Sequence, residues 1–125
     1  MIKNLLLIAL GGGLGSCARY AFYVLINSNG IKWVPTFAVN LLGCALLGLL
    51  MGLHENNELH PSAILILGIG FCGGFTTFST FSFEIFQFFK QDLFWYALLY
   101  AATSVILGLA MVYIGYRCAQ LLAVG

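Results

Sequence analysis

The stretch "GFCGGFTTFSTFSFEIF", residues 70–86, combines glycines, hydroxyl side chains and phenylalanines inside a long apolar segment. As a straight helix at ~1.5 Å per residue, the segment 61–89 would exceed about 40 Å, more than a ~30 Å hydrocarbon core requires. Gly73 and Gly74, followed by the β-branched pair Thr76 and Thr77, weaken a helix near its centre. The sequence therefore predicts two half-helices, 61–73 and 78–89, separated by a mid-membrane break near 74–77.

The rest of the chain has the composition of a membrane protein. It has 125 residues, of which 62% are hydrophobic and 7% are charged. At ~20 apolar residues per crossing, this length permits about four helices. We expect an all-α integral membrane protein in which residues 1–125 form a single domain, in the lipid bilayer of a bacterial inner membrane. Its transmembrane helices are predicted at 2–26, 33–53, 61–89 and 93–121.

The basic residues predict no preferred orientation in the membrane. Lys3 and Arg117 lie on the side of the termini, whereas Lys32 and Lys90 lie on the other side, with Arg19 inside the first crossing toward it. Orientation follows the Lys and Arg bias of the loops, and here that bias is close to nil. We therefore expect dual topology, in which the chain pairs with an inverted copy of itself as an antiparallel homodimer.

A break at bilayer depth leaves backbone groups without helical partners, so it survives only when buried in protein or filled by ions and water. Free carbonyls at the end of the first half favour a cation, and two inverted copies would supply enough of them to surround one. Free N–H groups at the start of the second half, with the Ser79 and Thr80 hydroxyls, favour an anion nearby. The alternative is a simple kink that neighbouring helices satisfy.

Two phenylalanines follow the predicted break on one helical face. Phe78 and Phe81 are three residues apart, and the positive edge of a phenyl ring can solvate a small anion without binding it as tightly as a charge would. Ordinary core packing is the alternative for an aromatic pair at this spacing.

Few other polar residues lie within the predicted crossings, and each needs a role because unpaired polar groups are costly in hydrocarbon. Asn40 carries two amide donors that could hold an anion or pin a neighbouring helix. Tyr100 and Ser104 are four apart and could continue a track of hydroxyls. Arg19 either attracts anions at a water-filled mouth or extends to the interface, and Glu84 lies near the exit of the second half-helix.

Small residues four apart predict close contacts between helices. The pairs are Gly11 with Gly15, Gly12 with Ser16, Gly48 with Gly52, and Gly70 with Gly74.

The sequence resembles the Fluc/CrcB family of fluoride channels over essentially its whole length. The resemblance rests on "GGGLGSCARY" at 11–20, "NLLG" at 40–43 and above all "GFCGGFTTFSTFSFE" at 70–84. It implies a dual-topology homodimer that passively exports fluoride through two pores. It also implies a central sodium ion that is structural and not conducted.

The resemblance also implies roles for individual residues. The main-chain carbonyls of Gly73 and Thr76 would bind sodium. The fluoride pathway would comprise Asn40, Phe78, Phe81, Ser79, Thr80, Tyr100 and Ser104. The chain departs from many relatives at Phe75, where they have leucine, and at Gly108, where they often have a hydroxyl.

Other functional classes fit the sequence less well. A small multidrug-type proton antiporter would share the size and topology but needs a carboxylate at mid-membrane, whereas Glu84 lies toward one end of its crossing. A membrane assembly subunit would conduct no ions. We do not expect an enzyme, because the sequence has no Ser/His/Asp constellation and both histidines, His54 and His60, fall in one predicted loop.

Overall fold

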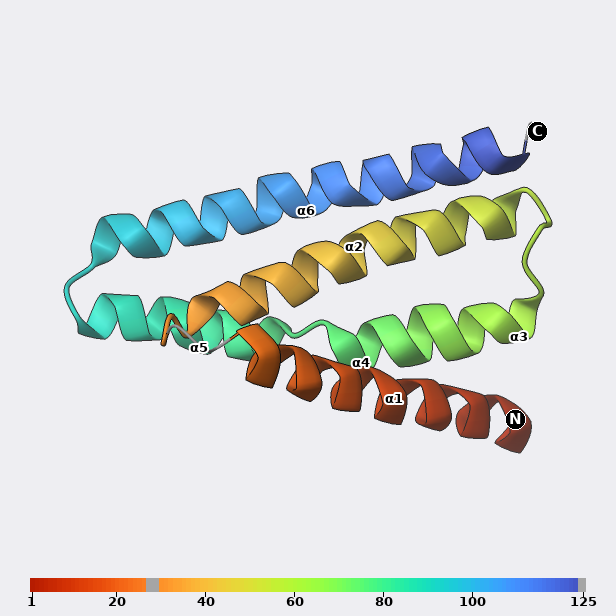
Figure 1. Ribbon diagram of the computed structural model, residues 1–125, viewed down its shortest axis with the longest axis horizontal. Helices are drawn as coiled ribbons and strands as arrows, with labels where there is room; N and C mark the ends of the chain where they lie inside the picture. Colours follow the sequence, from red (N-terminus) through yellow and green to blue (C-terminus); the bar gives the residue numbers. More distant parts are fainter. Residues whose placement is uncertain (27–29, 124–125) are drawn as a thin grey trace.

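The computed structural model describes residues 1–26 and 30–123, and these form an antiparallel bundle of helices (Figure 1). The first two long helices are α1 (Ile2–Ile26) and α2 (Trp33–Glu55). The third helical segment comprises α3 (Pro61–Ala63), η2 (Ile64–Cys72), α4 (Gly73–Phe75) and α5 (Phe78–Lys90), and α6 (Phe94–Ala123) follows it. Within these described residues, four helices, counting Pro61–Lys90 as one, are long and apolar enough to cross a membrane. This confirms the predicted all-helical membrane fold.

The helices pack in two main pairs. α2 packs along α6, and α1 packs along η2 and α4. The start of α1 and the end of α6 lie at the same end of the bundle (Figure 1). This arrangement places α2 between the third segment and α6.

Glycines allow the close contact between α1 and the third segment. A methyl group on Gly11 would collide with the backbone of Ile66, and one on Gly15 would collide with the backbone of Phe71. The absence of a side chain therefore lets the two helix backbones touch, as the small-residue spacing predicted.

Glycines also line the contact between α2 and α6. A methyl group on Gly48 would meet the Val112 carbonyl, and one on Gly115 would meet the Ala45 carbonyl. Each helix therefore contributes a glycine to the close approach of α2 and α6.

The glycines predicted to break the third segment are helical instead. Gly73 and Gly74 belong to α4, so helical conformation extends through Phe75, further than predicted. A methyl group on Gly74 would collide with the carbonyl of Gly12, so this glycine serves packing against α1. Only Thr76 (φ −80°, ψ 162°) and Thr77 (φ −151°, ψ 118°) adopt extended conformations between α4 and α5.

The sequence did not predict the π-helix η2, in which the hydrogen-bonded ring is one residue wider than in an α-helix. Its buried residues, Gly68, Gly70 and Cys72, alternate along the chain and are all small. This wider helix leads directly into the short α4.

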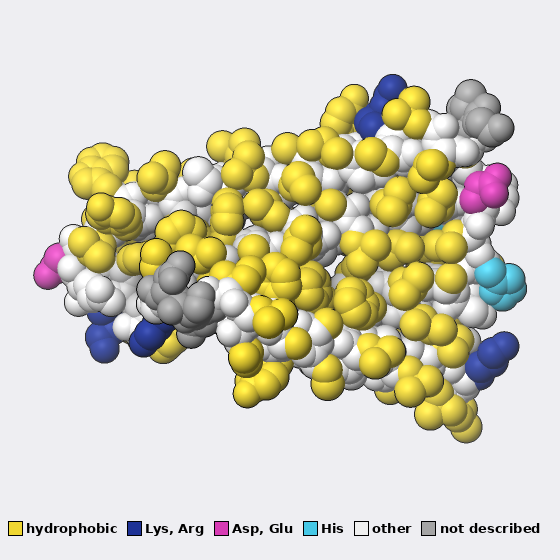
Figure 2. Space-filling model, in the orientation of Figure 1, with side chains coloured by type: hydrophobic (Ala, Val, Ile, Leu, Met, Phe, Trp, Pro, Cys, Tyr) yellow, Lys and Arg dark blue, Asp and Glu magenta, His cyan; other side chains and the backbone are white. Residues whose placement is uncertain are grey.

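The surface of the bundle is mostly apolar between its two ends. In Figure 2 hydrophobic side chains cover the middle of the visible face, and most of the charged side chains lie toward the ends. Leu10 and Leu109 are 64% and 68% exposed within the single chain. Apolar exposure on this scale requires lipid or another protein chain as a partner.

Replacing Gly15 with alanine tests the close packing of α1. Gly15→Ala places a methyl group against backbone atoms of Phe71 and Phe75, which cannot move as a flexible side chain would. We expect destabilisation by about 1–3 kcal/mol, measured as a lower thermal unfolding midpoint in detergent.

Gly13→Ala is the matched control, because no atom of another described helix lies within 4 Å of a methyl group placed on Gly13. Alanine also has the higher helix propensity, so this variant should be neutral or slightly more stable than the parent chain. Equal losses of stability in both variants would contradict the packing argument.

Candidate functional site

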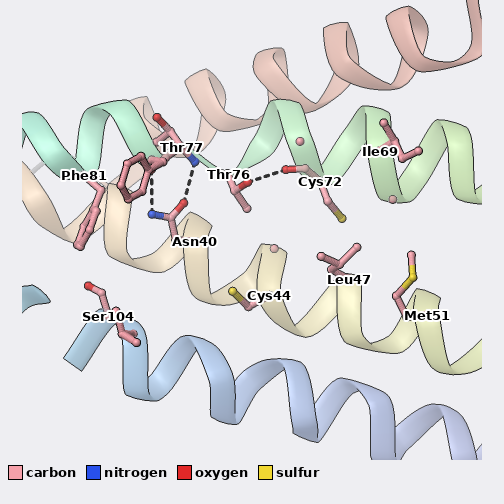
Figure 3. A pocket seen from close by; sticks show the side chains of 15 residues that line it. Asn40, Cys44, Leu47, Met51, Ile69, Cys72, Thr76, Thr77, Phe81 and Ser104 are labelled. Atoms are coloured by element: carbon pink, nitrogen blue, oxygen red, sulfur yellow. Dashed lines mark hydrogen bonds between the residues drawn. The ribbon is translucent and has the colours of Figure 1, made fainter. Parts of the chain in front are cut away.

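Asn40 of α2 holds the backbone of Thr77 with two hydrogen bonds. The Thr77 N–H donates to Asn40 Oδ1 (2.8 Å), and Asn40 Nδ2 donates to the Thr77 carbonyl (3.1 Å) (Figure 3). In a continuous α-helix the Thr77 N–H would instead bond to the Gly73 carbonyl. The Gly73 carbonyl has therefore lost its helical donor to the side chain of Asn40.

The Thr77 side chain caps the start of α5. Its Oγ1 accepts a hydrogen bond from the Thr80 N–H (3.2 Å) and donates to Thr80 Oγ1 (3.0 Å). The Thr80 N–H would reach the Thr76 carbonyl in a continuous helix, so that carbonyl has also lost its helical donor. The sequence predicted free N–H groups at the start of α5. Two of these groups have side-chain acceptors instead, because the Thr77 N–H binds Asn40 and the Thr80 N–H binds the Thr77 hydroxyl.

Thr76 is fixed from the opposite side of the junction. Its N–H and its Oγ1 both donate to the Cys72 carbonyl, at 2.9 and 2.8 Å. A methyl group on Gly43 of α2 would collide with the Thr76 side chain. The two extended residues thus have defined partners on both sides, and Thr77 is only 6% exposed.

A cavity of about 600 Å³ adjoins this junction. Residues from α2, η2, α4, α5 and α6 line it, and Figure 3 shows the side chains around it. It brings together six of the residues predicted for the sodium site and the fluoride pathway, namely Asn40, Gly73, Thr76, Phe78, Phe81 and Ser104. None of its lining residues is charged, and Leu47, Met51 and Ile69 make part of its wall apolar.

Two polar groups at this cavity retain hydrogen-bonding capacity. Ser104 Oγ is buried and has no hydrogen-bond partner within the described part of the chain. Asn40 uses one of its two amide N–H groups on the Thr77 carbonyl, which leaves the other. Both are neutral donors beside an otherwise largely apolar space.

The two predicted phenylalanines lie side by side but differ in their surroundings. Their ring centroids are 6.0 Å apart. Phe81 packs edge to face with Tyr100 at 5.2 Å, whereas Phe78 is 80% exposed. Phe78 is therefore open for contact with something outside the single chain.

Glu84 lies in a hydrogen-bonded network that joins four helices. Thr36 Oγ1 donates to Glu84 Oε1 (2.6 Å), and the Tyr100 hydroxyl donates to Glu84 Oε2 (2.7 Å). Thr36 Oγ1 also bonds to the hydroxyl of Tyr23 (2.8 Å). Tyr100 thus binds Glu84 and is absent from the lining of the cavity that contains Ser104.

The remaining predicted residues are more dispersed. Thr80 and Glu84 line a second cavity of about 310 Å³. Ser79 is exposed and its Oγ lies 3.3 Å from Thr77 Oγ1. Arg19 is half-buried and lines neither cavity.

Sequence reasoning missed Thr77, Thr36 and Tyr23 as members of the site. Thr36 is fully buried and lies one helical turn before Asn40, so its spacing alone could have placed it on the same face of α2. No spacing could have paired Thr36 with Glu84, because the two lie on different helices.

Comparisons with known proteins agree with this architecture. A family model described as "CrcB-like protein, Camphor Resistance (CrcB)" matches residues 6–116. A protein of Azobacteroides pseudotrichonymphae named "Fluoride-specific ion channel FluC" is 42% identical over 119 residues, covering 93% of this chain and 95% of the relative. Proteins of the same name from Phocaeicola vulgatus and Thermus thermophilus are 46% and 41% identical; each match covers at least 91% of both chains.

The family match begins within the first apolar helix and ends within the fourth, and the relatives align over nearly their full lengths. The chain is therefore a multi-pass membrane protein and belongs to the CrcB-like family.

Proposed function

We propose that this protein is a fluoride-specific ion channel that passively exports fluoride from the cytoplasm. The observation that carries the proposal is the cavity beside the α4–α5 junction, where the Ser104 hydroxyl and one Asn40 N–H lie near the rings of Phe78 and Phe81. The name of the relatives, "Fluoride-specific ion channel FluC", supports the same assignment.

Neutral donors suit the conduction of a small anion. Fluoride is a strong hydrogen-bond acceptor, and a hydroxyl, an amide N–H and the positive edges of phenyl rings can replace part of its water shell. No lysine or arginine lines this cavity, so no fixed positive charge would hold the anion there. The site therefore favours passage over tight binding.

A passive pore is sufficient for export. Hydrogen fluoride crosses membranes as a neutral weak acid and ionises in a less acidic cytoplasm, where fluoride then accumulates. A negative interior drives the anion outward with ~2.3 kcal/mol per charge per 100 mV.

We further propose that two inverted copies associate through the face that carries the α4–α5 junction. Phe78 is 80% exposed there, and apart from the local backbone and the chain neighbours no atom of the described residues lies within 4 Å of a methyl group placed on Gly73. Both features leave room for a second chain at the junction. In the antiparallel dimer the interruption at Thr76 and Thr77 lies at mid-membrane, and each of two pores uses residues from this face.

A structural sodium ion fits the backbone at the same junction. The carbonyls of Gly73 and Thr76 have both lost their helical donors, to Asn40 and to the Thr77 hydroxyl. Sodium is a hard cation that prefers such neutral oxygen ligands, and two copies would provide two carbonyls each. The ion would stabilise the paired junctions without being conducted.

Ion flux through the purified protein tests the channel function. Liposomes that contain only this chain should release fluoride when the membrane potential is collapsed, and should retain chloride under the same conditions. Phe81→Ile should lower fluoride flux at least tenfold while leaving the dimer intact, because it removes the ring edge from the cavity wall.

Phe86→Ile is the matched control, because Phe86 is 55% exposed on α5 and lines neither cavity. It should conduct like the parent chain. No fluoride release, or equal release of chloride, would contradict the channel. Flux that depends on a proton gradient would instead favour the antiporter.

Removal of the Ser104 hydroxyl separates conduction from stability. Because Ser104 Oγ has no partner in the described chain, Ser104→Ala should leave the thermal unfolding midpoint unchanged or slightly raised. Fluoride flux should fall severalfold, since the cavity loses a donor. A lower midpoint with unchanged flux would assign the hydroxyl to folding alone.

Exchange of the cation tests sodium and the dimer together. Purified protein should have the mass of two chains in sodium chloride, and its unfolding midpoint should fall in N-methylglucamine chloride. If sodium is present at 100 times its dissociation constant, its removal should lower the free energy of unfolding by about 2.7 kcal/mol. Equal midpoints would exclude the sodium site, and the mass of one chain in both salts would exclude the homodimer.

A further inference from the structure

Two thiols line the uncharged cavity beside the α4–α5 junction. All four cysteines of the chain are free, and they divide into two pairs by position. Cys44 of α2 is half-buried, Cys72 at the end of η2 is 3% exposed, and both line this cavity (Figure 3). Cys17 and Cys118 are exposed and line neither cavity. The first cavity therefore carries two soft nucleophiles that the proposed conduction does not use.

The thiol of Cys44 lies beside α6, close to the level of the free polar groups. A methyl group on Gly108 would lie 3.5 Å from Cys44 Sγ, in ordinary van der Waals contact. Gly108 lies one helical turn beyond Ser104 on α6, and Cys44 lies one turn beyond Asn40 on α2. The thiol is therefore one turn along the cavity from both groups that retain hydrogen-bonding capacity.

The rest of the lining favours a soft ion over a hard one. The thioether of Met51 gives this cavity a third sulfur atom, and none of the described residues that line it carries a carboxylate. Sulfur ligands select soft ions such as Cu(I), whereas Mg²⁺ and Ca²⁺ prefer carboxylates. The lining also has no lysine or arginine that would repel a cation.

We propose that the thiols of Cys44 and Cys72 make this cavity a binding site for soft monovalent metal ions, and that a bound ion closes the fluoride pathway. The inference rests on the proposed channel function. The thiolate is the form that binds metal, so each thiol that takes up Ag⁺ releases its proton and forms a sulfur–silver bond. No electron is transferred. The bound metal then occupies space that fluoride would need beside Ser104 and Phe81.

Silver inhibition of fluoride efflux tests the closure of the pathway. The full-length protein is assayed in liposomes loaded with potassium fluoride, and Ag⁺ is added as the nitrate in chloride-free buffer because silver chloride precipitates. Ag⁺ should lower the efflux of the parent chain about tenfold or more, since thiolates bind soft ions tightly. Excess dithiothreitol should restore the efflux.

The four cysteines supply matched variants with equal numbers of thiols. Efflux through Cys44→Ala/Cys72→Ala should be insensitive to Ag⁺, whereas Cys17→Ala/Cys118→Ala should be inhibited like the parent chain. Each variant is compared with its own efflux without silver, so a change in basal conduction does not enter the comparison. If the alanine pair in the cavity does not fold, Cys44→Ser/Cys72→Ser removes the same sulfur atoms with a smaller change in volume.

Metal and proton counts test binding without any flux. After gel filtration, Cys17→Ala/Cys118→Ala should retain Ag⁺ on its cavity thiols and should release one proton for each ion bound, measured with a pH-sensitive dye. The chain with all four cysteines replaced by alanine should retain no silver.

The outcomes separate this inference from the channel function. If the parent chain conducts no fluoride, the proposed function and the closure of the pathway both fail, and the metal counts still decide whether the thiols bind silver. If the parent conducts and Ag⁺ leaves its efflux unchanged, or inhibits the cavity variant equally, the inference is overturned although the channel stands. Equal retention of silver by the cysteine-free chain would also overturn the site.

Discussion

The double hydrogen bond between the Asn40 side chain and the Thr77 backbone is the contact on which the site depends. It satisfies an N–H and a carbonyl that have left the helical pattern, where unpaired groups would cost several kcal/mol in hydrocarbon. It also releases the Gly73 carbonyl, because one N–H cannot serve both acceptors well. A side chain of α2 thereby leaves the Gly73 carbonyl of the third segment without its helical donor.

Close packing by glycine keeps this junction in register with its neighbours. Gly74 lies against the backbone of Gly12 on one side, and Gly43 admits the side chain of Thr76 on the other. Larger residues would push α1 or α2 away and move Asn40 out of reach of Thr77. In lipid, where the hydrophobic effect does not drive helices together, such backbone contacts provide much of the association.

The polar groups of the bundle fall into two environments. One cavity has only neutral groups beside aromatic rings, and the other has a lysine, a carboxylate and amides. Phe81 lines the uncharged cavity, and Thr80, the residue before it on α5, lines the other. Helix α5 therefore contributes residues to both environments.

Hydropathy alone establishes that the chain has four apolar helices, because transfer of each segment into lipid depends on its own side chains. The pairs of glycines likewise indicate close helix contacts, and "GFCGGFTTFSTFSFE" indicates the family. The sequence misplaced the helix-breaking role on Gly73 and Gly74, since glycine propensity cannot reveal that Gly74 packs on Gly12. The partners of Asn40 and Glu84 depend on how separate helices pack, because hydrogen bonds act only over about 3 Å and residues far apart in the chain meet only in the folded bundle.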